Sequence, residues 1–245
     1  MKIAIISDLH SNIEALQACL ARAQGQNVEK YICLGDIIGY GPDPAEVLDI
    51  VMSLPNVEVV KGNHEEALFT AYYKGLRQHI RQTVDWTKSQ LSASQLAYLE
   101  TLPYQVKVGD VTMVHASADQ PKKWPYIYNI ELATKCMRAS DSLVTFVGHT
   151  HQPEIFFETP SKHIKNITPS PGLSVPLYAH CRYVINVGSV GQPRDDINAA
   201  SFVIYDTVER EVKFHRVAYD YMATGKKIIQ CGLPHLFAER LAKGH

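Results

Sequence analysis

The stretch KIAIISDLHSNIE, residues 2–14, predicts a buried strand that passes through a polar loop into a helix. Its apolar run, Lys2–Ser7, is short and β-prone. Ser11-Asn12-Ile13-Glu14 then fits the capping-box pattern with which helices begin. Asp8 and His10 fall on the loop between the two elements. The stretch therefore places a carboxylate and an imidazole just beyond the end of a strand.

Two more β-prone runs follow, Lys30–Leu34 and Val57–Lys61, and helical patterns separate the three runs. This order predicts a βαβαβ opening with parallel strands. A second capping signal at Ser92 predicts another helix, which Pro103 ends. The first half of the chain is therefore predicted to alternate strands and helices.

The second half is predicted to be mostly β, within one domain that spans residues 1–245. Gly109-Asp110 predicts a hairpin turn, and its glycine-first order favours type II′. Thr159–Pro176 carries four prolines and is predicted to be an irregular surface excursion. Strands are predicted at Gln105–Val108, Val111–His115, Leu143–Gly148, Tyr183–Gly188, Ser201–Asp206 and Glu211–Val217.

Composition excludes several classes of function. The 245 residues are 46% hydrophobic, enough for a sizeable core, and 24 basic residues nearly balance 25 acidic ones. This balance shows no extended surface for nucleic acid or for an anionic membrane, so a small anionic substrate would have to be held locally, by a metal or a few placed donors. The apolar run after Lys2 is too short for a signal-peptide core or a membrane span. We therefore expect a cytoplasmic protein.

The five cysteines and a group of aromatic residues bear on covalent and quaternary structure. The cysteines are odd in number and show no CxxC spacing, which predicts structural thiols and not a disulfide or a cysteine metal site. The oligomeric state is open, because four aromatic residues fit an oligomer interface as well as the core: Tyr72, Tyr73, Trp86 and Tyr98.

Five predicted strand ends carry metal-ligand residue types. Each has an ordinary explanation when taken alone, such as a helix cap, a hydrogen-bonded core histidine or an exposed loop. Together they favour a site, because functional residues collect at the carboxyl ends of strands in open α/β sheets. The five motifs are Asp8-x-His10, Gly35-Asp36, Gly62-Asn63-His64-Glu65, His115 and Gly148-His149-Thr150-His151.

The types of ligand indicate the chemistry of this site. Imidazole, carboxylate and amide oxygen without thiolate suit zinc, manganese or iron, and their number exceeds the need of one tetrahedral ion. Two ions about 3.5–4 Å apart, bridged by one carboxylate, would use all of them and would clamp a phosphoryl group. A single-metal hydrolase or a metal sensor that uses only some of the ligands stays open.

In their order, the motifs D-x-H, G-D, G-N-H-E, H and G-H-T-H resemble those of the calcineurin-like metallophosphoesterases over Ile3–Gly188. The resemblance implies an α/β fold, a four-layer αββα sandwich with two mixed β-sheets. It implies two divalent ions, with manganese expected and iron or zinc as alternatives. The implied ligands are Asp8, His10, Asp36 and His151 for one ion and Asp36, Asn63, His115 and His149 for the other, with Asp36 as the bridge.

The same resemblance implies a catalytic role for His64, which stabilises charge on the phosphate or protonates the leaving oxygen. The nucleophile would be a hydroxide that bridges the metals, and no covalent enzyme intermediate is expected.

The run Gly35–Pro42, GDIIGYGP, distinguishes between branches of this family. The protein phosphatases and dinucleoside tetraphosphate hydrolases continue as G-D-x-V-D-R-G, whereas Gly39 and Tyr40 stand here in place of the aspartate and arginine. A hydroxyl cannot replace a guanidinium fork on phosphate. The run instead resembles the small bacterial and archaeal phosphodiesterase-type (YfcE-like) members. Tyr40 and Arg194 are then the candidate substrate contacts, with Arg194 as the replacement cation.

Three functions therefore compete. The leading prediction is a dinuclear-metal phosphoesterase that acts on phosphodiesters or nucleotides. A serine/threonine-type protein phosphatase or dinucleoside tetraphosphate hydrolase is the first alternative. A non-catalytic protein-binding scaffold of the same fold is the second, and the presence of His64 argues against it.

The loop that follows His115 departs from the branch pattern. His115-Ala116-Ser117-Ala118 stands where branch members usually have His-Gly-Ser-Pro. The loop 119–129 then holds three aromatic residues that either stack on a nucleobase or pack on the domain surface, and we expect packing. They are Trp124, Tyr126 and Tyr128.

Overall fold

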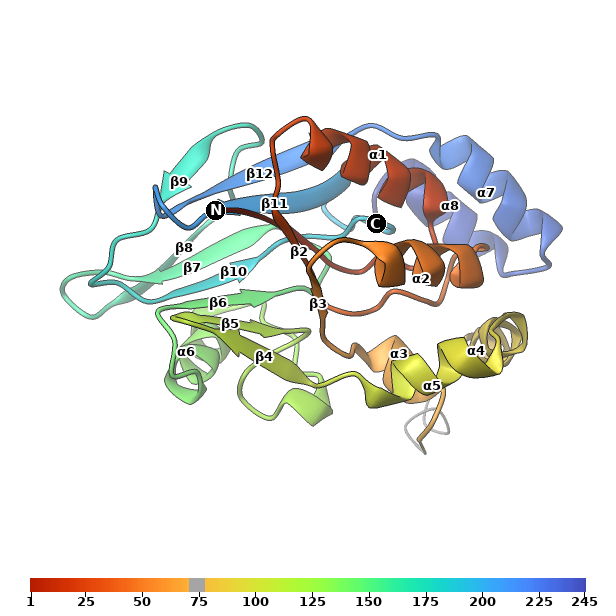
Figure 1. Ribbon diagram of the computed structural model, residues 1–245, viewed down its shortest axis with the longest axis horizontal. Helices are drawn as coiled ribbons and strands as arrows, with labels where there is room; N and C mark the ends of the chain where they lie inside the picture. The colour runs from red at the N-terminus through yellow and green to blue at the C-terminus, as the bar shows by residue number, and fades with distance from the viewer. Residues whose placement is uncertain (71–77) are drawn as a thin grey trace.

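Two stacked β-sheets form the centre of the molecule (Figure 1). The computed structural model describes residues 1–70 and 78–245, and within them both sheets are six-stranded and mixed. The first sheet has the order β3 (Val57–Val59), β2 (Lys30–Cys33), β1 (Lys2–Ile6), β11 (Ala200–Asp206), β12 (Glu211–Val217) and β9 (Ser174–Pro176). The second has the order β4 (Gln105–Val108), β5 (Val111–Val114), β6 (Val144–Val147), β10 (Tyr183–Asn186), β7 (Glu154–Glu158) and β8 (Ile164–Ile167).

Helices lie outside the two sheets (Figure 1). Along the described chain they are α1 (Ile13–Gln24), α2 (Pro44–Ser53), α3 (Asn63–Ala67), α4 (Gln78–Gln90), α5 (Ala93–Thr101), α6 (Ile130–Ala139), α7 (Tyr221–Gln230) and α8 (His235–Lys243), with a short 3-10 turn, η2, at Pro121–Lys123.

The strand directions bring the motif loops together. In the first sheet β1, β2 and β3 run parallel, and in the second β5, β6 and β10 run parallel. Parallel neighbours end at the same edge of their sheet, where sites collect. The loops that follow these strands are therefore neighbours although they are distant in sequence.

Apolar side chains fill the space between the sheets and the space between each sheet and its helices. Ile5 of the first sheet and Phe146 of the second belong to one buried cluster between the sheets. Ile6 faces the other way and packs in a cluster with Leu16 of α1. Cys136 of α6 packs against the outer face of the second sheet. The predicted α/β fold, with two mixed sheets flanked by helices, is confirmed.

Local capping confirms one prediction and corrects another. Ser92 and Gln95 form the predicted capping box at the start of α5. At α1 the cap is Asn12 and not Ser11: the Asn12 Oδ1 accepts the N–H of Ala15 at 3.1 Å. Ser11 has φ 52°, a left-handed conformation within the polar loop, and α1 therefore begins one residue later than the capping box predicts.

Two predicted segments differ in outcome. The hairpin at Gly109 is present, since β4 pairs antiparallel with β5 and Gly109 has φ 58°. The predicted irregular excursion at Thr159–Pro176 is wrong in part, because it contains β8 and β9. Both are short strands at sheet edges, mostly exposed, and they pair through backbone groups. Their side chains therefore carry little of the alternating pattern by which strands are predicted.

The remaining predictions on covalent structure and surface have these outcomes. All five cysteines are free thiols, and Cys231 is exposed while the other four are buried. Trp86 packs beside Phe237 and Tyr98 packs on the cluster that includes Leu16, whereas Tyr72 and Tyr73 lie outside the described residues. Across residues 1–70 and 78–245, no helix has the length and apolar content that crossing a membrane requires.

Candidate metal centre

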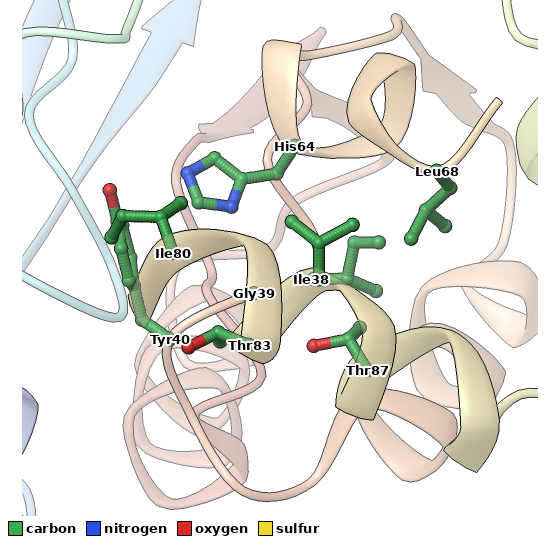
Figure 2. Close-up of a pocket in the computed structure, with 9 residues that line it drawn as sticks. Ile38, Gly39, Tyr40, His64, Leu68, Ile80, Thr83 and Thr87 are labelled. Carbon is green, nitrogen blue, oxygen red and sulfur yellow. The ribbon is translucent and has the colours of Figure 1, made fainter. Parts of the chain in front are cut away.

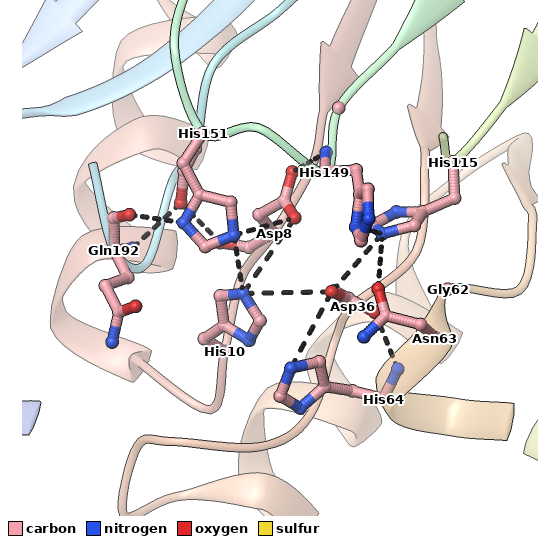
Figure 3. Close-up of polar contacts among 12 residues, drawn as sticks. Asp8, His10, Asp36, Gly62, Asn63, His64, His115, His149, His151 and Gln192 are labelled. Carbon is pink, nitrogen blue, oxygen red and sulfur yellow. Dashed lines mark hydrogen bonds and ion pairs between the residues drawn. The ribbon is translucent and has the colours of Figure 1, made fainter. Parts of the chain in front are cut away.

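The seven side chains predicted as metal ligands converge at the carboxyl ends of the parallel strands (Figure 3). They form two groups, each with ligand atoms within 4.8 Å of one another, and Asp36 belongs to both. One group is Asp8, His10, Asp36 and His151, and the other is Asp36, His115 and His149. Asn63 joins the second group, because its Oδ1 lies 3.1 Å from Nε2 of His115.

Backbone carbonyl groups orient the four histidines of the two ligand groups. In each ring one nitrogen donates its N–H to a carbonyl oxygen, so the other nitrogen presents its lone pair to the centre. Metal-bound histidines are usually fixed in this way. The four bonds are His10 Nδ1 to Ile38 at 3.2 Å, His115 Nδ1 to Leu34 at 2.8 Å, His149 Nε2 to Trp124 at 3.1 Å and His151 Nδ1 to Gln192 at 2.6 Å.

These orientations bring lone pairs face to face. Nε2 of His10 lies 3.1 Å from Nε2 of His151, and Nε2 of His115 lies 3.1 Å from Nδ1 of His149. With the other nitrogen of each ring already protonated, two neutral rings would bring two acceptors together and repel each other unless a proton or a metal cation lies between them. A cation between the two nitrogens converts this repulsion into coordination. The donor set therefore fits divalent metal.

The two carboxylates complete the groups. The Oδ2 of Asp36 lies 3.3 Å from Nε2 of His115 and 3.9 Å from Nε2 of His10, between the two groups. The Oδ1 of Asp8 lies 3.1 Å from Nε2 of His151 and is fully buried, yet it has no hydrogen-bond partner among the described residues. A buried carboxylate oxygen without a donor is costly. A bound cation would satisfy it.

The pKa values follow from burial and from this clustering of charge. Burial raises the pKa of Asp36, but His115 and His64 outweigh it and hold that pKa well below its usual range. Burial lowers the pKa of His149 to about 3, so that ring is a neutral ligand. At His115 burial also lowers the pKa, but Asp36 outweighs it and raises the value to about 9. The position between His115 and Asp36 therefore favours a positive charge.

Five of the ligand residues have left-handed backbone conformations. Such φ values are uncommon for residues other than glycine, and they cluster at functional sites. The loops turn sharply immediately after their strands, and this turn directs each side chain back over the strand ends. The five are Asp8 (φ 54°), His10 (46°), Asp36 (51°), His149 (67°) and His151 (62°).

Glu65, whose role the sequence did not indicate, ties two of the motif loops together. Its fully buried carboxylate accepts the backbone N–H groups of Asp36 at 2.8 Å, Ile37 at 2.9 Å and Gly62 at 2.8 Å. Burial and the Asp36 carboxylate raise its pKa to about 7. The last residue of Gly-Asn-His-Glu therefore positions the Asp36 loop against the Asn63 loop.

Gly62 allows this close approach between the loops. A Cβ atom on Gly62 would collide with the backbone N and the side chain of Asp36. Asp36 in turn accepts the backbone N–H of His64 through Oδ1 at 2.9 Å. The glycine that precedes Asn63 is thus required by contact with the shared carboxylate.

His64 lies beside the metal centre and outside both ligand groups. Its Nε2 is 4.0 Å from Oδ2 of Asp36, and its ring packs edge-on against Tyr40 at 4.5 Å and His10 at 4.7 Å between centroids. A small cavity of about 10 Å³ lies behind the ring, lined by Thr83 and Thr87 of α4 among others (Figure 2). A Cβ atom on Gly39 would collide with Nδ1 of His64.

Three aromatic side chains of the loop 119–129 have different environments. Trp124 is buried, with its ring 5.8 Å from His115. Tyr126 is 49% exposed and stacks on His149 with ring centroids 4.0 Å apart. Tyr128 is 73% exposed. The prediction of surface packing therefore describes Trp124, whereas Tyr126 covers a ligand of the metal centre.

Of the two predicted substrate contacts, Tyr40 lies directly beside the centre and Arg194 lies over Tyr40. The Tyr40 ring is 4.6 Å from that of His10, and the guanidinium carbon of Arg194 is 5.8 Å from the Tyr40 ring. The backbone N–H of Arg194 donates to the carbonyl of His151 at 3.3 Å. Arg194 is thus anchored next to a metal-centre histidine.

Two mixed sheets thus carry a buried cluster of histidine and aspartate side chains at their strand ends. The family model of the calcineurin-like phosphoesterase superfamily domain matches residues 1–210, and the chain belongs to that superfamily. The predicted family is therefore confirmed. Its members are hydrolases that generally bind divalent metals, in accord with the centre seen here.

Individual relatives extend this finding over the whole chain. A metallophosphoesterase from Sphaerobacter thermophilus is 39% identical with a TM-score of 0.90, and the match covers 100% of this chain and 99% of that one. An uncharacterised protein of Methanocaldococcus jannaschii is 34% identical over 99% of this chain and 98% of its own length. A symmetrical bis(5'-nucleosyl)-tetraphosphatase of Pectobacterium atrosepticum is 26% identical over 59% of this chain and 51% of its own length.

Proposed function

We propose that this protein hydrolyses phosphodiester or nucleotide-type phosphoester bonds with two divalent metal ions. One observation carries the proposal: the Oδ2 of Asp36 lies between two groups of inward-facing histidine nitrogens. Asp8, His10, Asp36 and His151 would hold one ion and Asp36, Asn63, His115 and His149 the other. Bound there, two cations would polarise the phosphate oxygens and lower the pKa of water between them.

His64 is proposed as the catalytic residue. It is nearly buried and belongs to neither ligand group, yet its Nε2 faces the shared carboxylate. In this role the ring donates a hydrogen bond to the phosphate, or gives its proton to the leaving oxygen. A positioned acid of this kind is typically worth about 10²–10⁴ in rate. Tyr40 restrains the ring on one side, which keeps Nε2 directed at the centre.

Arg194 and Tyr40 are proposed as the substrate contacts. The Arg194 guanidinium would bind a phosphate oxygen and the Tyr40 hydroxyl would donate a second hydrogen bond. Gly39 supports the choice of diesters, since the aspartate of the protein-phosphatase motif cannot stand at this position without displacing His64. The likeness to a dinucleoside tetraphosphatase favours hydrolysis of such nucleotides as the second candidate.

The test combines metal content with two substrates. Protein reconstituted with manganese is analysed by mass spectrometry for bound metal and assayed with a bis-aryl phosphodiester and an aryl phosphomonoester. We expect two ions per chain and hydrolysis of the diester. Fewer than two ions would contradict the dinuclear centre. Hydrolysis of the monoester alone would make a protein phosphatase the favoured function.

The His64→Ala variant separates catalysis from metal binding. We expect it to keep both ions and to lose about 10²–10⁴ of kcat for the diester, since it lacks only the proton donor. The control is His180→Ala, which removes an exposed imidazole far from the motif loops in sequence. Full activity in His64→Ala would remove this residue from the mechanism.

A further inference from the structure

Two arginines near Tyr40 have no acidic partner among the described residues. Among the described residues, neither Arg194 nor Arg240 forms an ion pair with a carboxylate, and the segment 71–77 contains no aspartate or glutamate in its sequence. Asp195, the nearest acid in sequence to Arg194, pairs instead with Arg216. The chain as a whole has a formal net charge of −1, so the two unpaired guanidinium groups form a local concentration of positive charge.

Helix α8 brings Arg240 to the centre. Phe237, three residues earlier on the same helix, packs its ring 4.9 Å from Tyr40. Leu241 lines a small cavity together with His10 and Gln192. Residues three and four apart share a helix face, so Arg240 lies on the face that α8 turns toward Tyr40. Figure 1 shows α8 beside α7 at the edge of the first sheet's helical layer.

The end of α8 also contacts the loop that carries Arg194. The carbonyl of Gly244 accepts the backbone N–H of Asp196 at 2.9 Å, and Nδ1 of His245 lies 3.3 Å from Oδ1 of Asp196. These contacts fix the position of the Arg194 loop relative to α8. The two arginines thus belong to one packed unit.

The Arg194 side chain keeps donor capacity for a ligand. One terminal nitrogen donates to Oε1 of Gln192 at 2.8 Å, while its buried Nε has no partner in the part of the chain that the structure describes. The pKa of Arg240 is lowered by burial and by the charge of Arg194. The two guanidinium groups are therefore close enough for their charges to repel. Two like charges held together without a carboxylate favour an anion between them.

We propose that Arg240 binds a second phosphate group of the substrate, with Arg194 between that group and the phosphate at the metal centre. The preferred substrates would then carry two linked phosphates, as phosphoanhydride-linked nucleotide esters do. This inference rests on the proposed function for the first phosphate. It adds Arg240, which lies beyond the residues 1–210 that the family model matches.

Direct binding tests the second-phosphate site without turnover. Manganese-loaded protein, at one fixed excess of free manganese, is titrated by calorimetry with methylphosphonate and with methylenediphosphonate. We expect the wild type to bind the diphosphonate roughly 10- to 100-fold more tightly, since hydrogen bonds between charged groups are strong. In Arg240→Met this affinity ratio should fall to within about threefold of unity, and Arg240→Lys should give an intermediate ratio.

The control variant is Lys243→Met, which removes an exposed charge from the same helix, and it should keep the wild-type ratio. An unchanged ratio in Arg240→Met, or equal binding of the two ligands by the wild type, would overturn the proposal. If the protein cleaves the aryl diester but shows no preference for the diphosphonate, only the second-phosphate site is contradicted. If it shows the preference but hydrolyses no ester, the proposed reaction is contradicted.

Discussion

The metal centre and its rim are built in different ways. The candidate metal centre consists of residues near the ends of strands: Asp8, His10, Asp36, His115, His149 and His151 on loops that follow strands, and Asn63 at the first residue of α3. The rim consists of Tyr126, Arg194 and Arg240, which come from a long connecting loop, from the loop after β10 and from α8. Apart from half-buried Asn63 the centre is buried, whereas the rim is partly exposed.

From this difference we expect the metal centre to carry the reaction and the rim to select the substrate. The ligand residues are positioned by strand direction and by hydrogen bonds from their imidazole rings to backbone carbonyl groups. The rim depends on how separate segments pack over the centre, and Arg240 lies outside the region that defines the family. We therefore expect substitutions at the rim to change the choice of substrate more than the reaction itself.

The largest expected effect comes from the shared carboxylate. Asp36→Asn removes the negative charge between the two groups and should lower the affinity for both ions by more than about 100-fold, since even the hydrogen-bond partners of ligands are worth about 10- to 100-fold. Mass spectrometry after dialysis against limiting manganese measures the metal, and the diester assay measures activity. If only one ion is lost, Asp36 is not a bridge.

A smaller effect is expected from the residue that holds the loops of the metal centre together. Glu65→Gln replaces a buried carboxylate oxygen by an amide that faces backbone N–H donors. We expect the free energy of unfolding to fall by about 2–4 kcal/mol, because buried donors lose their acceptor. Urea unfolding of the metal-loaded protein measures it. Glu131→Gln, at an exposed glutamate paired with Lys135, is the control and should change stability little. Equal stability of both variants would contradict the role given to Glu65.

The smallest effect is expected at the rim. Tyr126→Leu removes the ring that stacks on His149, and aromatic pairs are worth about 0.5–1.5 kcal/mol. The affinity for manganese should therefore fall roughly two- to tenfold, measured by titration with a competing chelator. Tyr128→Leu is the matched control, since its ring is 73% exposed. A loss as large as that of Asp36→Asn would remove the distinction between metal centre and rim.

The sequence predicted which side chains gather at the candidate metal centre because each of them follows a predicted strand. Ile3–Ile6 is a short apolar run, and the residues just beyond such a run must lie at the sheet edge. The cap of α1 was misplaced by one residue, because the left-handed turn at Ser11 depends on tertiary contacts and not on the capping pattern.

The rest of the site depends on contacts that carry no local signal. Trp124 and Gln192 orient His149 and His151 through their carbonyl oxygens, which every residue possesses. Glu65 stood within a recognised motif, but its bonds to the Asp36 loop appear only when the two loops are brought together. The position of Arg240 depends on how α8 packs against Tyr40, about two hundred residues earlier in the chain.

The left-handed ligand residues set stability against catalysis at the same positions. Each such conformation costs of order 1 kcal/mol for a residue with a side chain, and glycine would relieve that cost. Glycine would also remove the chemistry, as stabilising substitutions at active sites often do. A lineage released from selection for hydrolysis would therefore gain stability by losing these ligands one by one. At these five positions the side chains proposed to bind metal are therefore held at a cost to backbone stability.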